Sequence, residues 1–142
     1  MTIAAILQSK GGDIVSVGPD IRVREVVKLL AERRIGAVPV IGGGQVLGIF
    51  SERDVIYGLA QEGPAMMDRR VEEVMTSPAL TVDRTTPILS ALALMTRRRI
   101  RHLPVVEGEA VIGVVSIGDL VKLRLARIEA EAEAMRHYIA GN

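Results

Sequence analysis

Several residue types that carry protein chemistry are absent or rare in this sequence. Its 142 residues include no cysteine and no tryptophan, and only two tyrosines and one phenylalanine. The absence of cysteine excludes disulfides, thiolate metal ligands and cysteine nucleophiles. So few aromatic rings leave almost no stacking platform for single-stranded nucleic acid, and a net charge of +1 provides no overall attraction to a polyanion. We therefore expect neither a disulfide scaffold nor a nucleic-acid-binding protein.

Long hydrophobic runs are also missing. No stretch approaches the roughly 18 apolar residues of a membrane-spanning helix, and no basic region precedes the short apolar run at the N-terminus. We expect a cytoplasmic protein without a membrane partner. Apolar residues make up 49% and charged residues 25% of the chain, a balance typical of globular proteins, and the length suits one compact body.

The chain contains an internal duplication. Residues 14–60 align without a gap on residues 79–125, and 12 of the 47 pairs are identical. Five identical pairs are turn, bend or polar residues: Pro39 with Pro104, Gly43 with Gly108, Gly48 with Gly113, Ser51 with Ser116, and Asp54 with Asp119. Identity at such positions indicates that one structural unit occurs twice.

Each copy has the pattern of a β-α-β-β-α unit. A short extended segment, "DIVSV" or "PALTV", is followed by turn and N-cap residues. Apolar residues at helical spacing then predict a helix, over 23–34 in the first copy and from residue 88 in the second. Two apolar strands joined by "GGG" or "EGE" predict a hairpin. The predicted fold class is α+β, with two repeats packed sheet to sheet about a pseudo-twofold axis and an extended C-terminal helix.

The duplication also suggests where the parts begin and end. We predict a first domain with its N-terminal segment over 1–62, a linker over 63–73, a second domain over 74–126 and a helical extension over 127–142. Met66, Met67 and Val71 are expected to dock the linker as a short helix.

The most informative motif is "GIFSERD" at 48–54, repeated as "GVVSIGD" at 113–119. Each serine stands where a strand gives way to a helix, and the aspartate follows three residues later, which is close to a capping box. The same helix end offers free N–H groups to an anion, and the carboxylate suits the two hydroxyls of a ribose. Capping alone and nucleotide binding both remain open on these residues.

The chain resembles a tandem pair of CBS domains, the regulatory module of IMP dehydrogenase and of the gamma subunit of AMP-activated protein kinase. The resemblance covers about residues 10 to 126 and depends on "RIGAVPV" and "RIRHLPV", each followed at a fixed distance by one serine–aspartate motif, and on "VMTSPALTV" at 74–82. It implies a stand-alone sensor that binds AMP, ADP, ATP or NAD, with S-adenosylmethionine possible, in two clefts between the halves. The ligand would modulate another, unidentified protein.

The resemblance also assigns residues to each cleft. In the first, Ser51, Arg53 and Asp54 would face Thr86, Pro87, Ala91 and Ile100. In the second, Ser116 and Asp119 would face Ile21, Val26, Ile35, Gly36 and Ala37. Arg101 and His102 would lie in the middle, near the phosphates of both ligands.

The two clefts differ in charge. Arg53, Arg101 and His102 can donate charge-assisted hydrogen bonds to phosphate, whereas their counterparts, Gly118, Gly36 and Ala37, cannot. This asymmetry predicts that at least one nucleotide binds and that the cleft containing Asp54 prefers the more highly phosphorylated ligand.

Two other functions compete with this interpretation: a structural dimerisation module without a ligand, and a nucleotide-hydrolysing enzyme. His102 is the candidate general base, but no nucleophile is anchored near it, so we predict no catalytic residue and no metal site. Lys10 is expected to be a solvated loop lysine, with contact to a phosphate as the alternative.

The end of the chain carries a helical apolar stripe. Its residues are spaced 4, 3, 4, 3 and 4 apart: Val121, Leu125, Ile128, Ala132, Met135 and Ile139. This is a heptad pattern, which can pack on the body of the same chain or on a second copy. We favour the second copy and expect a homodimer.

Overall fold

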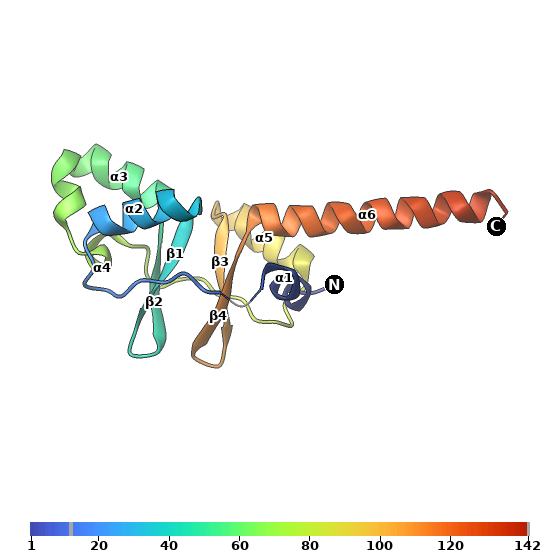
Figure 1. Ribbon diagram of the computed structural model, residues 1–142, viewed down its shortest axis with the longest axis horizontal. Helices are drawn as coiled ribbons and strands as arrows, with labels where there is room; N and C mark the ends of the chain where they lie inside the picture. The colour runs from blue at the N-terminus through green and yellow to red at the C-terminus, as the bar shows by residue number, and fades with distance from the viewer. Residues whose placement is uncertain (12, 142) are drawn as a thin grey trace.

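The computed structural model describes residues 1–11 and 13–141 (Figure 1). The first half comprises helices α1 (Ile3–Lys10), α2 (Val23–Arg33) and α3 (Glu52–Glu62), and strands β1 (Ala37–Gly42) and β2 (Gln45–Ser51). A 3-10 helix, η1 (Gly63–Asp68), and α4 (Val71–Val74) lead to the second half, which comprises α5 (Ile88–Arg98), β3 (His102–Glu107), β4 (Ala110–Ser116) and α6 (Ile117–Ile139). From α5 to the start of α6, each element begins 65 residues after its counterpart, so the predicted duplication is confirmed.

The centre of each half is an antiparallel hairpin, and the two hairpins stand next to each other (Figure 1). Positive φ angles of Gly43 and Gly44 in one turn, and of Gly108 in the other, permit these tight connections. Each predicted first strand is reduced to one parallel bridge, from Val17 to Val40 and from Val82 to Val105. The predicted α+β class with two repeated units and a long C-terminal helix is confirmed.

Each half has its own hydrophobic core, but each core is completed by a helical segment that precedes the other repeat in the sequence. Ile3 and Ile6 of α1, from the start of the chain, are buried in the core of the second half. Met66 and Val71, from the connection, are buried in the core of the first half. Backbone hydrogen bonds hold α1 there, from Ile3 N to Thr86 O at 3.0 Å and from Ile88 N to Met1 O at 3.1 Å. The N-terminal segment therefore packs on the half that follows it by some 80 residues in the sequence.

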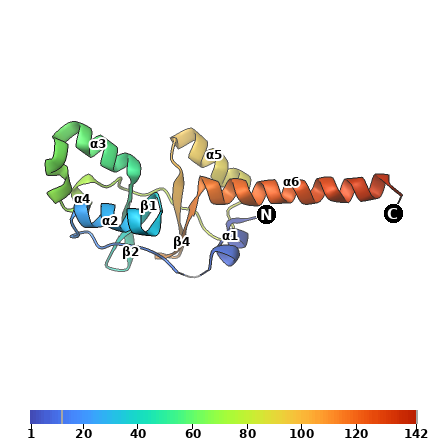
Figure 2. The same ribbon diagram turned by 45° about the horizontal axis from the view of Figure 1, so that its top comes forward.

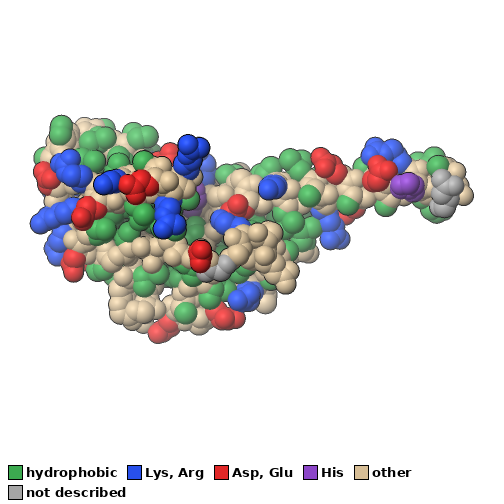
Figure 3. Space-filling view, in the orientation of Figure 1, with side chains coloured by type: hydrophobic (Ala, Val, Ile, Leu, Met, Phe, Trp, Pro, Cys, Tyr) green, Lys and Arg blue, Asp and Glu red, His purple; other side chains and the backbone are tan. Residues whose placement is uncertain are grey.

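Helix α6 begins on the body of the protein and continues well beyond it (Figures 1 and 2). Leu120 is fully buried and anchors the first turn. Further along, Leu125 is 54%, Met135 58% and Ile139 76% exposed. Hydrophobic side chains accordingly appear among charged ones along the protruding helix (Figure 3). Within the described residues, the body of the same chain does not cover this stripe.

None of the helices in the described part of the chain combines the length and the apolar character needed to cross a membrane.

Candidate functional site: two clefts between the repeats

The repeated Ser-x-x-Asp motif forms the predicted capping boxes. The Ser116 backbone N–H donates to Asp119 Oδ2 at 2.8 Å, and the Asp119 N–H donates to Ser116 Oγ at 3.1 Å. In the first half, the Ser51 N–H and hydroxyl both donate to Asp54 Oδ2, at 2.9 and 3.2 Å. These bonds satisfy helix N–H groups and hold both carboxylates in fixed rotamers. Because both carboxylates also line a cleft, capping and a ligand-binding geometry occur together.

We name the two cavities after their carboxylates. The Asp54 cleft has a volume of about 540 Å³ and the Asp119 cleft about 470 Å³. Both volumes lie in the range of small-molecule sites, roughly 300 to 1,000 Å³. Residues of both repeats line each cleft, so a ligand in either one would contact both halves.

Most of the residues predicted for the clefts line them. The Asp54 cleft contains Ser51, Arg53, Asp54, Ile100, Arg101 and His102. The Asp119 cleft contains Ser116, Asp119, Ile35, Gly36 and Ala37, and also His102.

Five predicted residues lie elsewhere. Val26 and Ala91 are fully buried on the core-facing sides of α2 and α5. The Thr86 hydroxyl accepts from the Asp83 N–H at 3.1 Å, and Pro87 precedes the first turn of α5. Ile21 packs against the core of the first half.

The length of the helices explains this difference. Each cleft lies beyond the C-terminal end of α2 or α5, where Ile35 and Ile100 are found. Both helices have 11 residues and are therefore about 16 Å long. Residues before their first turn, such as Ile21 and Pro87, are a helix length away from the ligand space.

The segments that lead into each repeat form the missing walls. Thr76, Pro78 and Leu80 line the Asp54 cleft, and Asp13, Ile14 and Val15 line the Asp119 cleft. The Thr76 hydroxyl donates to Asp54 Oδ1 at 2.9 Å. Sequence reasoning used "VMTSPALTV" only as a family marker and missed its role as a wall. The signal available was the duplication, which places 11–15 and 76–80 at equivalent positions.

The Asp54 cleft is rich in guanidinium groups. Arg53, Arg98 and Arg101 line it, against the carboxylates of Glu52 and Asp54. Arg53 Nη1 also donates to the backbone carbonyl of Arg99, which ties α3 of the first half to the second half. Guanidinium groups suit bidentate recognition of phosphate.

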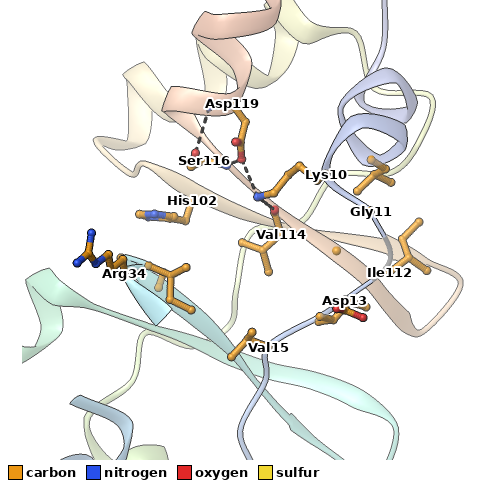
Figure 4. A pocket seen from close by; sticks show the side chains of 16 residues that line it. Lys10, Gly11, Asp13, Val15, Arg34, His102, Ile112, Val114, Ser116 and Asp119 are labelled. Atoms are coloured by element: carbon orange, nitrogen blue, oxygen red, sulfur yellow. Dashed lines mark hydrogen bonds and ion pairs between the residues drawn. The ribbon is translucent and has the colours of Figure 1, made fainter. Parts of the chain in front are cut away.

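The Asp119 cleft holds a cation that sequence reasoning placed in solvent. Lys10 Nζ donates to Asp119 Oδ2 at 2.8 Å and to the Val114 carbonyl at 2.9 Å (Figure 4). Lys10 is the last residue of a helix and forms an ion pair, so the expectation of a loop lysine was wrong, although its side chain is still 42% exposed. Partial burial acts to raise the pKa of Asp119, but the hydrogen bonds from Lys10 and Ser116 outweigh it and lower this pKa below its ordinary value. Arg34 is the other strong base in this cleft, and Asp13 is the second carboxylate.

His102 and Gly36 line both clefts. Burial lowers the pKa of His102 below that of an ordinary histidine, and the charge of Arg101 lowers it further. These effects favour the neutral form of His102. It stands at the junction of the two clefts, where protonation would place a positive charge beside both.

A duplicated hairpin unit with a serine–aspartate corner in each of two inter-repeat clefts defines a CBS domain pair. The CBS domain family model matches residues 6–61 and 71–126, so the chain belongs to the CBS domain family. The CBS domain-containing protein CBSX3, mitochondrial, of Arabidopsis thaliana is 33% identical over 99% of this chain and 72% of its own length.

Solved structures show the same arrangement. The CBS-domain containing protein ATU1752 from Agrobacterium tumefaciens is 38% identical and superimposes with a TM-score of 0.84, over 87% of this chain and 99% of that one. CBS domain protein PAE2072 from Pyrobaculum aerophilum, solved in complex with AMP, is 29% identical with a TM-score of 0.75, over 89% of this chain and 99% of that one.

Proposed function

We propose that this protein is a regulatory module that binds an adenosine nucleotide in the clefts between its two CBS repeats. The observation that carries the proposal is the position of Asp54 and Asp119. Each carboxylate is held beside the N-terminal end of a helix and opens into a cavity large enough for a nucleotide. A carboxylate can accept hydrogen bonds from a ribose diol, while the helix end and nearby bases favour phosphate.

The AMP complex of the Pyrobaculum aerophilum relative supports the class of ligand. AMP, ADP, ATP, NAD and S-adenosylmethionine share the adenosine moiety. The carboxylates of Asp54 and Asp119 can accept hydrogen bonds from the ribose of any of them. Binding, rather than hydrolysis, is the proposed activity. A phosphate-release assay with ATP would reveal the competing enzymatic function.

Within this function, the Asp54 cleft is the proposed site for the more phosphorylated ligand. It presents three guanidinium groups, whereas the Asp119 cleft presents one ammonium and one guanidinium group. Lys10 and Arg34 make the asymmetry smaller than the sequence suggested, but they do not reverse it.

Isothermal titration with AMP, ADP, ATP and NAD tests the proposal. Asp54→Asn and Asp119→Asn are the informative variants, because asparagine keeps an acceptor for the capping box and removes only the charge and one carboxylate oxygen. We expect Asp54→Asn to weaken ATP binding more than Asp119→Asn. Equal losses would contradict the preference. If no adenine nucleotide binds or shifts the melting temperature, the structural dimerisation function is favoured instead.

Regulation follows from the place of the ligand between the repeats. A ligand that contacts both halves stabilises the relative orientation in which it binds best, and it shifts the equilibrium by its difference in affinity for the two states. A partner protein would then recognise the altered surface.

The homodimer is also a proposal, and the exposed stripe of α6 supports it. Beyond the first turn, the stripe includes five large apolar side chains that the body leaves exposed, namely Val121, Leu125, Ile128, Met135 and Ile139. The occupant we propose is α6 of a second copy, since the same heptad spacing on both helices permits knobs-into-holes packing. The charged residues flanking the stripe agree with a parallel pair. In register, Arg124 lies near the partner's Glu129, and Glu131 near the partner's Arg136.

Light scattering tests the helix pairing. Truncation after Arg127 and the substitution Ile128→Glu are both expected to lower the measured mass or to raise the midpoint concentration of association. Ala130→Glu is the matched control, because it adds the same charge on the opposite face of α6. An unchanged mass in the first two variants would show that α6 does not associate.

A further inference from the structure

The two clefts differ in the donor that reaches their carboxylate. The segment entering each repeat passes the cleft at equivalent positions, so residues 10 and 11 correspond to residues 75 and 76. In the Asp54 cleft, the donor is the neutral hydroxyl of Thr76, at 2.9 Å from Oδ1. In the Asp119 cleft, it is the ammonium group of Lys10, at 2.8 Å from Oδ2. A pseudosymmetric fold thus carries a chemically asymmetric pair of contacts.

The fold holds Lys10 in this place. It is the last residue of α1, whose Ile3 and Ile6 are buried in the core of the second half. Its ammonium group also donates to the Val114 carbonyl at 2.9 Å, so β4 and α6 each provide one acceptor (Figure 4). The contact joins residues 109 positions apart and does not follow from local chain geometry.

From this geometry we infer that the ammonium group of Lys10 competes with the ribose hydroxyls of a ligand for the carboxylate of Asp119. The inference rests on the proposed function, in which the Asp119 carboxylate accepts from the two hydroxyls of a ribose. Oδ2 already accepts from the Ser116 N–H and from Lys10. A diol that uses both carboxylate oxygens must therefore share or displace the ammonium group.

The cost of that exchange differs between the clefts. A ribose hydroxyl that replaces Thr76 exchanges one neutral donor for another. A hydroxyl that replaces Lys10 gives up a charge-assisted hydrogen bond, which is roughly twice as strong as a neutral one. Because Lys10 is anchored through α1, its local concentration at the carboxylate stays high. The Asp54 cleft therefore fills first with a neutral nucleoside, and the Asp119 cleft fills last.

The test is a titration of the full chain with adenosine, followed by amide NMR. Adenosine carries the diol and lacks phosphate, so electrostatic attraction to the bases of either cleft does not mask the competition. The Ser116 and Gly113 amides report the Asp119 cleft, and the Ser51 and Thr76 amides report the Asp54 cleft. Lys10→Met removes the ammonium group and keeps an apolar stem, whereas Lys10→Arg keeps the charge. Thr76→Val removes the neutral donor of the other cleft.

We expect Lys10→Met to tighten adenosine binding in the Asp119 cleft by about fivefold, the upper range for a partly exposed ion pair. Affinity in the Asp54 cleft should be unchanged. Lys10→Arg should bind adenosine about as tightly as the wild type. Thr76→Val should change the adenosine affinity of the Asp54 cleft by less than about threefold. Weaker or unchanged binding in the Asp119 cleft of Lys10→Met would overturn the inference.

A second measurement does not depend on a ligand. The pKa of the Asp119 carboxyl group, followed by its carbon resonance, should rise in Lys10→Met and stay low in Lys10→Arg. No rise in Lys10→Met would show that the ion pair is absent in solution and would overturn the inference. If neither adenosine nor AMP perturbs either set of amides in any variant, the proposed function itself is refuted, and the inference with it. Binding in both clefts with no effect of Lys10→Met refutes only the role of Lys10.

Discussion

Gly36 and His102 face each other where the two clefts meet, and a side chain at position 36 would collide with the imidazole. A Cβ atom there would lie 2.9 Å from His102 Cε1 and 2.5 Å from Glu52 Oε1. Because one residue pair forms a wall of both cavities, we expect the occupancy of one cleft to affect the other through this wall.

Gly36→Ala should therefore disturb both clefts at once. The carboxylate of Glu52 is the end of a flexible side chain and can move, but the imidazole is half-buried and lines both clefts, so its displacement changes the shape of both. We expect a loss of about 1 to 2 kcal/mol in the free energy of unfolding, as for mild overpacking. Urea denaturation measures this loss, and amide NMR should show shifts at both Ser51 and Ser116. Shifts confined to one of the two would contradict a shared wall.

The depressed pKa of His102 makes a prediction about acid stability. Since burial and Arg101 lower this pKa in the folded state, the unfolded chain binds a proton more readily. The stabilisation due to neutral His102 is present above the unfolded pKa of about 6.5 and is lost as the pH falls through the folded pKa. The difference in unfolding free energy between the wild type and His102→Gln should shrink over that interval. A difference independent of pH would show that His102 titrates normally.

Asp119 makes a similar prediction at lower pH. Its folded pKa is below the ordinary value, so the carboxylate stabilises the fold above the unfolded pKa of about 3.9 and loses this effect as the pH falls through the folded pKa. Asp119→Asn should cost about 1 kcal/mol or less at pH 7, because Lys10 is partly exposed. The cost should disappear in strong acid. Thermal unfolding of both proteins between pH 2 and pH 7 measures it.

The exchanged packing of α1 can be tested in the core. Ile3 is fully buried among residues of the second half, so Ile3→Ala should lower the free energy of unfolding by about 2 to 5 kcal/mol. Ile56→Ala is the matched control, since Ile56 on α3 is 64% exposed and its truncation should cost little. Hydrogen exchange should show faster opening of β3 and β4 than of β1 and β2 in Ile3→Ala. The opposite order would place α1 on the first half in solution.

The fold could be predicted largely because its signals are local or repeated. The Gly43 and Gly108 turns, the helical spacing of Val23, Val26 and Leu30, and the Ser-x-x-Asp caps are readable within a few residues each. Because the pattern occurs twice, each predicted element is supported by a second copy. The packing of α1 on the second half could not be predicted, because it depends on contacts between residues about 80 apart and produces no periodic sequence pattern.

The candidate site could be predicted in part for the same reason. The residues of the serine–aspartate motif, together with Ile35, Ile100 and His102, lie close to the recognisable repeat and reach the clefts as expected. Lys10 was misplaced, because nothing near it in the chain indicates that its partner is Asp119. Ile21 and Pro87 were assigned to the clefts without allowing for the length of the helix that follows each of them.

The placement of α1 has a consequence for synthesis on the ribosome. This helix is synthesised before the second half, and the surface that receives it exists only after β3 and β4 have left the exit tunnel. The first half acquires its own covering from η1 and α4, which follow it directly, and can close while translation continues. Helix α1 therefore docks after both hairpins have been synthesised, although it precedes them in the chain, and the second core stays incomplete until that step.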